Sequence, residues 1–319
     1  MTRVDLITGF LGAGKTTFLL RYAEYLLRQG LRIAILAYDH GSVNVDMPLL
    51  GELRSDRCEI EMLAGACDPD CHRRRFRTKL ISMGMRGFDR ILIEPSGVFD
   101  MDEYFDTLSD SPLDRWFEPG SVITVVDAKL EENLSAEEDY YLASQAVSAG
   151  CILLSRTQLV SEADVERTLL HLEKAAAAIS AGGEIRSRVL AKDWADLSDA
   201  DFLYLMNCGY AAGDYIKLIA GSDSSFQSLS FLNLTLSRDA LAEKTSLLFR
   251  DPSYGRILRV KGFFEENGRW YQLNATEKEL QIDEIPDNRS ALIVIGRNLN
   301  EDAINILLTG KPPELHILG

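Results

Sequence analysis

The segment GFLGAGKT, Gly9 to Thr16, decides the fold. It matches the motif G-x-x-x-x-G-K-[ST], whose glycines let the backbone curl so that several N–H groups point at phosphate oxygens. An apolar run, VDLIT (4–8), precedes the motif, and an amphipathic segment, TTFLLRYAEYLLRQG (16–30), follows it. Because a strand before and a helix after are the context that the motif requires, the sequence predicts a phosphate-binding loop rather than a glycine-rich turn that binds nothing.

The residues of this loop have distinct expected roles. Lys15 would reach the β- and γ-phosphates of a nucleoside triphosphate, and the hydroxyl of Thr16 would ligate Mg²⁺. The predicted nucleotide-binding residues of the loop are Gly9, Gly12, Ala13, Gly14, Lys15, Thr16 and Thr17.

Acidic residues that could serve the metal follow predicted strands farther along the chain. Asp39, Glu94 and Asp127 each end an apolar run, and ligands gather at the carboxyl ends of the strands in an open parallel sheet. Glu94 is favoured because EPSG (94–97) places Gly97 three residues on, where its N–H could turn towards the γ-phosphate as in a switch segment. For Asp39 and Asp127 two interpretations carry equal weight, a direct role at the site and a solvated position at a strand end.

Another acid lies in the loop HGSVNVDMPLL (40–50), between two predicted strands. Asp46 would act as a first switch residue that contacts Mg²⁺ directly or through water, and the alternative is an ordinary surface loop. Lys15, Thr16, Asp46 and Glu94 are therefore the predicted catalytic residues. The last three are also the predicted Mg²⁺ ligands.

The stretch GACDPDCHRRR (65–75) combines thiols, an imidazole and a basic cluster. Thiolate and imidazole groups in a short turn suit Zn²⁺ and similar cations. Cys67, Cys71 and His72 are therefore the predicted transition-metal ligands, to which the two aspartates between the cysteines could add oxygen atoms. A single C-x3-C is a weak signal, and the alternative is a pair of half-buried cysteines at the start of a helix.

The arrangement of apolar runs predicts the fold class. Up to residue 206, short β-branched runs alternate with helical segments, which predicts an α/β domain with a mostly parallel sheet covered by helices. Beyond it, a turn-rich stretch leads into several strands and two helices, which predicts an α+β domain. The expected division is a P-loop nucleotide-binding domain at 1–206, a linker at 207–225 and a C-terminal α+β domain at 226–319.

Composition excludes several classes of protein. The formal net charge is −15, so the surface would repel nucleic acid and anionic membranes. No apolar run approaches the roughly 20 residues that a membrane span needs. The amino end lacks the basic and apolar regions of a signal peptide, so we expect a cytoplasmic protein. Five cysteines are too few for a disulfide scaffold in a chain of 319 residues, which favours reduced thiols or metal ligands.

Taken together, these segments resemble the CobW-type GTPases, which are related to the hydrogenase and urease maturation GTPases. In chain order, the segments that carry the resemblance are GFLGAGKTT (9–17), GSVNVD (41–46), the cysteine turn, ILIEPSGV (91–98), VITVVDA (122–128), ILRVKGFF (257–264) and ALIVIGRNL (291–299). The resemblance covers nearly the whole chain. It implies Mg²⁺-dependent GTP hydrolysis linked to the handling of Zn²⁺ or Co²⁺, with a client metalloprotein or cofactor-assembly enzyme as partner. It implies the same roles for Lys15, Thr16, Asp46 and Glu94.

Two segments differ from the family pattern. The family's GCxCC motif is replaced by a wider cysteine spacing, and its guanine-reading NKxD motif is replaced by SRTQ (155–158). Gln158 offers one acceptor oxygen and a competing donor where the family's aspartate accepts two hydrogen bonds, a change that can cost about 1.5–3 kcal/mol of discrimination. The stem of Arg156 could still stack on a base. Ser155, Arg156 and Gln158 are the candidate base contacts, with GTP favoured over ATP.

Three functions compete for these features. The leading hypothesis is a nucleoside triphosphate hydrolase that acts as a metallochaperone or metal-insertion factor. One alternative is a P-loop kinase of a small molecule, in which RRRFR (73–77) forms a lid over the acceptor. The other is a non-catalytic, nucleotide-gated binding module. Metal affinity that differs between the GTP and GDP forms favours the first, phosphate transfer the second, and tight nucleotide binding without turnover the third.

Overall fold

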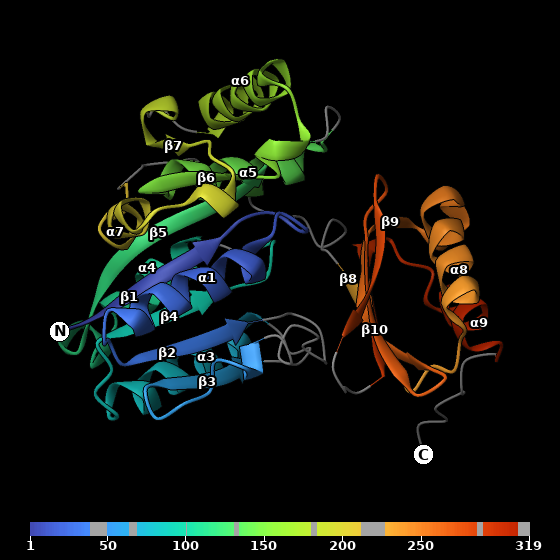
Figure 1. Ribbon diagram of the computed structural model, residues 1–319, viewed down its shortest axis with the longest axis horizontal. Coiled ribbons are helices and arrows are strands. Elements are labelled where there is room, and N and C mark those ends of the chain that lie inside the picture. The colour runs from blue at the N-terminus through green and yellow to red at the C-terminus, as the bar shows by residue number, and fades with distance from the viewer. Residues whose placement is uncertain are drawn as a thin grey trace. The chain divides into compact units, whose positions relative to one another are not determined.

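The computed structural model describes residues 1–38, 50–63, 69–99, 101–130, 134–179, 184–211, 227–285 and 290–311, with the backbone alone for 69–72. The chain forms two compact units, whose described residues run from 1 to 211 and from 227 to 311. Figure 1 draws the first unit in blue to yellow and the second in orange and red. Each unit is described by itself.

The first unit is built on seven parallel strands in the order β3-β2-β4-β1-β5-β6-β7. The strands are β1 (Thr2–Thr8), β2 (Ile33–Tyr38), β3 (Cys58–Leu63), β4 (Arg90–Glu94), β5 (Phe117–Asp127), β6 (Cys151–Ser155) and β7 (Val189–Leu190). The central strand β1 is buried from Val4 to Thr8, because helices lie on either side of it. The predicted fold class, a mostly parallel sheet covered by helices, is confirmed.

Helices cover both faces of this sheet because successive side chains of a strand point to opposite sides. The helices of the unit are α1 (Lys15–Arg28), α3 (Pro69–Gly84), α4 (Met101–Ser109), α5 (Ala136–Ser148), α6 (Glu162–Ile179) and α7 (Asp199–Met206). Val4 and Leu6 of β1 share a core with Phe76 of α3 and with residues of α4. Asp5, which lies between them in β1, faces α1 on the other side and accepts a hydrogen bond from the Tyr22 hydroxyl.

A buried ion pair fixes this second face. The carboxylate of Asp5 is 0% exposed and lies 2.6 Å from the guanidinium of Arg90, which is 4% exposed. Asp5 also accepts hydrogen bonds from the Tyr22 hydroxyl and the Ser121 backbone N–H, each at 2.8 Å. Arg90 donates to the carbonyl of Met206 at 2.9 Å. The pair therefore joins β1, β4, β5, α1 and the end of α7, and its remaining hydrogen-bonding groups are largely satisfied.

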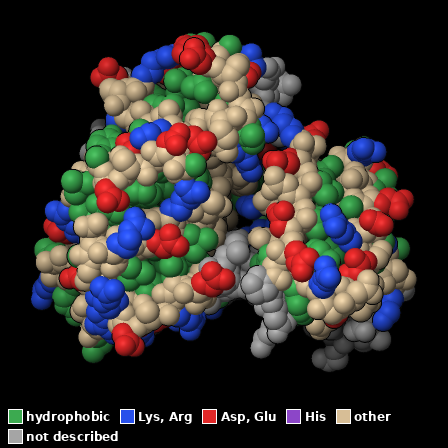
Figure 2. All heavy atoms as spheres, viewed as in Figure 1, with side chains coloured by type: hydrophobic (Ala, Val, Ile, Leu, Met, Phe, Trp, Pro, Cys, Tyr) green, Lys and Arg blue, Asp and Glu red, His purple; other side chains and the backbone are tan. Residues whose placement is uncertain are grey.

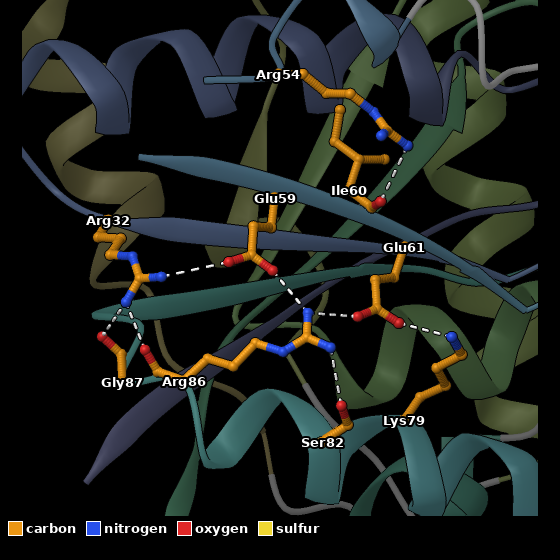
Figure 3. Close-up of polar contacts among 9 residues, drawn as sticks. All are labelled: Arg32, Arg54, Glu59, Ile60, Glu61, Lys79, Ser82, Arg86 and Gly87. Atoms are coloured by element: carbon orange, nitrogen blue, oxygen red, sulfur yellow. Dashed lines mark hydrogen bonds and ion pairs between the residues drawn. The ribbon is translucent and has the colours of Figure 1, made fainter. Parts of the chain in front are cut away.

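At the edge strand β3, a chain of charged side chains ties the strand to the end of α3 and the turn after it (Figure 3). Arg86 lies 2.6 Å from both Glu59 and Glu61, and Lys79 of α3 lies 2.7 Å from Glu61. Arg32 reaches Glu59 at 3.3 Å. Burial raises the pKa of Glu61, but hydrogen bonds from Lys79 and Arg86 outweigh it, so the net pKa is lowered. Charges on an exposed edge also discourage pairing with another sheet.

The second unit is a five-stranded antiparallel sheet in the order β11-β10-β9-β12-β8. Its elements are β8 (Gln227–Leu232), α8 (Arg238–Arg250), β9 (Arg256–Glu266), β10 (Arg269–Ala275), β11 (Leu280–Ile285), β12 (Ala291–Arg297) and α9 (Glu301–Thr309). Leu241 and Leu248 of α8 and Ile304 of α9 share a core with Val260 and Val294 of the sheet. The predicted α+β character of the C-terminal region is confirmed.

The surface carries charges of both signs. On the face shown in Figure 2, acidic and basic side chains alternate, and no continuous basic stripe is visible among the described residues. Among the helices that the structure describes, none has the length and apolar character to span a membrane.

Candidate nucleotide-binding site

The loop between β1 and α1 adopts a conformation that favours glycine at three positions. Gly9, Gly12 and Gly14 have φ angles of +144°, +79° and +101°. A Cβ on Gly9 would lie 2.2 Å from the carbonyl oxygen of Val125 in β5, so no larger residue fits there. No described side chain caps the amino end of α1, whose preceding residue is Gly14. The first N–H groups of the helix are thus placed to bind an anion.

Lys15 and Thr16 lie at this helix end and contact the loop and the neighbouring strand. The Lys15 ammonium donates to the carbonyl of Gly9 at 3.0 Å and is close to that of Phe10 at 3.4 Å. The Thr16 hydroxyl donates to Glu94 at 2.6 Å. Glu94 ends β4 and is only 7% exposed. A hydroxyl and a carboxylate side by side are the oxygen donors that Mg²⁺ prefers, so this pair fits the predicted metal.

The segment after Glu94 packs directly on the phosphate loop. A Cβ on Gly97 would lie 2.5 Å from the backbone nitrogen of Leu11. The carbonyl of Gly97 accepts a hydrogen bond from the side-chain amide of Gln145, in α5, at 3.2 Å. Residues that are far apart in sequence, at the ends of β1 and β4 and within α5, therefore meet at one place.

The SRTQ segment lies beside the other flank of the loop. Arg156 has a φ of +57°, donates to the carbonyl of Gly12 at 3.2 Å and pairs with the carboxylate of Asp127. Asp127, one of the three strand-end acids, is thus bound by a guanidinium. Ser155 is buried, whereas Gln158 is exposed in a short 3₁₀ turn.

Trp194 lies beside the SRTQ segment and Gly14, and it was not predicted from the sequence. Its indole carbon Cη2 lies 3.2 Å from where a Cβ of Gly14 would be, and its edge packs against Phe18 of α1 at 5.7 Å between ring centroids. Its N–H donates to the carbonyl of Leu154 at 2.9 Å. The indole therefore forms a wall next to the SRTQ segment.

Several predicted site residues lie outside the described part of the chain. Asp39, Asp46 and Cys67 are among them, and Cys71 and His72 are described only as backbone in the first turn of α3. Within the residues whose side chains are described, no group of three or more His, Cys, Asp or Glu is placed to hold a metal ion. The Mg²⁺ and transition-metal assignments that involve these residues stay predictions.

The basic segment 73–77, considered above as a lid, belongs to α3. Phe76 is fully buried in the core, Arg73 lies 3.8 Å from Asp110, and Arg77 donates to the carbonyl of Ser111. These contacts hold α3 against α4 and the turn that follows it. Arg73, Phe76 and Arg77 thus have structural roles.

A glycine loop at the carboxyl edge of a parallel sheet defines a P-loop NTPase fold when its threonine contacts an acid at the end of the neighbouring strand, as Thr16 contacts Glu94 of β4. Residues 3–182 match the model of the CobW/HypB/UreG nucleotide-binding domain, and residues 225–310 match that of the cobalamin synthesis protein cobW C-terminal domain. The chain belongs to the CobW/HypB/UreG family.

Curated relatives are similar over about half of the chain. The zinc chaperone YjiA of Escherichia coli is 31% identical over 170 residues, which cover 50% of this chain and 51% of YjiA. The zinc-regulated GTPase metalloprotein activator 1 of Schizosaccharomyces pombe is 29% identical, over 53% of this chain and 43% of its own length. The match thus spans about half the length of these relatives. The crystal structure of Zn(II)-bound YjiA GTPase from E. coli is 21% identical, with a TM-score of 0.37 and coverage of 97% and 98%.

Proposed function

We propose that the protein is a cytoplasmic GTPase that binds a transition metal and delivers it to a client metalloprotein or cofactor-assembly enzyme. The contact between Thr16 and Glu94, 78 positions apart in sequence, carries the nucleotide part of the proposal. It places a P-loop hydroxyl, an acid and the start of a glycine-containing switch segment together. The metal part is supported by membership of the family and by the names of the relatives.

The residues of the site have defined roles in this proposal. Lys15 stabilises charge on the β- and γ-phosphates, and the N–H groups at the start of α1 bind the phosphate oxygens. Thr16, Glu94 and Asp46 would hold Mg²⁺, which supplies stabilisation of the charge that develops on the phosphoryl group. Gly97 would offer its N–H to the γ-phosphate.

Recognition of the base rests on the SRTQ flank. Arg156, held by Gly12 and Asp127, offers its stem to one face of a base. Gln158 replaces the acid that reads guanine, and we expect discrimination between GTP and ATP to be about ten- to a hundredfold weaker than with an aspartate. GTP remains the favoured substrate.

Metal handling would depend on the state of the nucleotide. Cys67, Cys71 and His72 would bind Zn²⁺ or Co²⁺ as cargo through soft and borderline ligands. These residues lie between Asp46 and Glu94 in the sequence, so phosphate contacts at either end could alter the geometry of the turn. Hydrolysis would then change the affinity for the metal.

The test combines a nucleotide panel with metal titrations. Calorimetry with Mg²⁺ measures binding of GTP, GDP and ATP, and Zn²⁺ or Co²⁺ affinity is compared between the GDP form and a form with a non-hydrolysable GTP analogue. Lys15→Ala should abolish nucleotide binding or turnover, and Cys67→Ser/Cys71→Ser should remove the metal and leave nucleotide binding intact. Equal metal affinities in the two nucleotide forms would refute the coupling, whichever metal binds.

A further inference from the structure

Gln145 is a fully buried polar residue in α5 that the nucleotide motifs do not include. The helix begins with a capping box between Ser135 and Glu138, and Gln145 lies more than two turns farther on at 0% exposure. Its side-chain N–H donates to the carbonyl of Gly97 at 3.2 Å. Its backbone carbonyl accepts from the hydroxyl of Thr124, in β5, at 2.8 Å. The residue is therefore fixed to the sheet on one side and, on the other, to Gly97 of the predicted switch segment, residues 94–97.

The orientation of the amide follows from its partner. A carbonyl only accepts hydrogen bonds, so the NH₂ end of Gln145 must face Gly97. The other end, Oε1, is buried and has no hydrogen-bond partner among the described residues. A buried acceptor without a partner is unfavourable, so a leucine would serve better if this position needed only an apolar filler. The contact with Gly97 is what the amide contributes.

The contact completes a segment that is held at both ends. Glu94 accepts from Thr16 at the start of the segment, and Gly97 is bound by Gln145 at its end. The absence of a Cβ lets Gly97 pack on the backbone of Leu11. The Gly97 carbonyl and N–H belong to successive peptide groups. Holding the carbonyl against α5 therefore restricts the directions in which the N–H can point.

We propose that Gln145 is a positioning residue that holds Gly97 so that its N–H is placed in advance for the γ-phosphate. Pre-placement of this kind favours the ligand that makes the contact and not the one that lacks it. Gln145 would thus contribute to the preference for the triphosphate over the diphosphate. This inference rests on the proposed function, because it assumes that a nucleotide occupies the loop.

The experiment compares Gln145→Leu with the wild type for both ligands. The variant keeps the volume and burial and removes the donor. We expect its affinity for a non-hydrolysable GTP analogue to fall about tenfold, or about 1.4 kcal/mol, while its affinity for GDP changes less than about twofold. In steady-state assays, KM for GTP should rise by about the same factor as the affinity for the analogue falls. Ser148→Ala is the matched control, because Ser148 is 2% exposed in the same helix and its hydroxyl donates to the Ser144 carbonyl at 2.9 Å, the one hydrogen bond of that hydroxyl among the described residues.

The possible outcomes separate this inference from the function on which it rests. Equal losses for the analogue and GDP would indicate a purely structural role and overturn the inference, as would unchanged affinities in a folded variant. If Gln145→Leu does not fold, Gln145→Met provides the same comparison with a more flexible side chain. A wild type that binds no nucleotide overturns the proposed function and the inference with it. A wild type that discriminates, with a variant that does so equally, overturns the inference alone.

Discussion

Replacing Gly97 with alanine should slow nucleotide turnover and leave the protein folded. The new Cβ would lie 2.5 Å from the nitrogen and 2.9 Å from the Cα of Leu11, both of which are backbone atoms that cannot rotate away. The switch segment and the phosphate loop must therefore separate by about 1 Å, and a misplacement of that size can lower a rate about 100-fold. This corresponds to about 2.7 kcal/mol in activation free energy. The cost to stability should be about 1–3 kcal/mol, as for other overpacked sites.

Gly51→Ala is the matched control, because a Cβ on Gly51 meets no atom of the described residues within 4 Å. Turnover is measured as phosphate release at saturating GTP and Mg²⁺, and folding is followed by urea denaturation of each variant. We expect Gly51→Ala to behave as the wild type in both assays. If Gly97→Ala turns over at the wild-type rate, the packing of Gly97 on the phosphate loop does not matter for catalysis and the reasoning fails.

Three further predictions concern stability and the flank of the site. Arg90→Met should lower the free energy of unfolding by about 3–5 kcal/mol, because Asp5 loses its counter-ion. Burial already raises the pKa of Asp5, so protonation of Asp5 should reduce the difference in stability between variant and wild type as the pH falls. Urea denaturation curves in which that difference stays constant with pH would contradict this prediction. Glu61→Gln should cost up to about 2 kcal/mol at pH 7. The wild-type carboxyl has a lowered pKa, so its contribution is fully present above the ordinary value of 4.5 and declines as the pH falls through the lowered pKa. A difference between variant and wild type that does not shrink from about pH 5 to about pH 3 would refute the assignment. Nucleotide should change the tryptophan fluorescence of the wild type and of Trp116→Phe but not of Trp194→Phe, and the opposite pattern would show that the indole does not adjoin the nucleotide.

The parts of the site that are contiguous in sequence could be predicted well. The phosphate loop needs only glycines between a strand and a helix, and all three features lie in one short segment. The meeting of Glu94 with Thr16 could also be anticipated, because parallel strands bring their carboxyl ends to one edge of the sheet. The alternation of apolar runs likewise identified the sheet, since buried parallel strands are apolar on both faces.

Contacts that no local pattern records could not be predicted. Gln145 lies in a helix between Ser144 and Ala146. Nothing in the sequence marks its amide as a partner of Gly97, 48 positions away. Trp194 reaches Gly14 from beyond the last strand of the sheet. Asp127 looked like either a metal ligand or a solvated residue, and it instead pairs with Arg156, because that residue turns back in a left-handed conformation. Each of these contacts depends on tertiary packing.

The two units have separate hydrophobic cores, one centred on the parallel sheet and the other on the antiparallel sheet. A substitution inside one core should therefore lower the stability of its own unit first. The surface of residues 227–311 could therefore change without altering the loop between β1 and α1. Units with their own cores are the pieces of a chain that recombination can exchange without breaking either core.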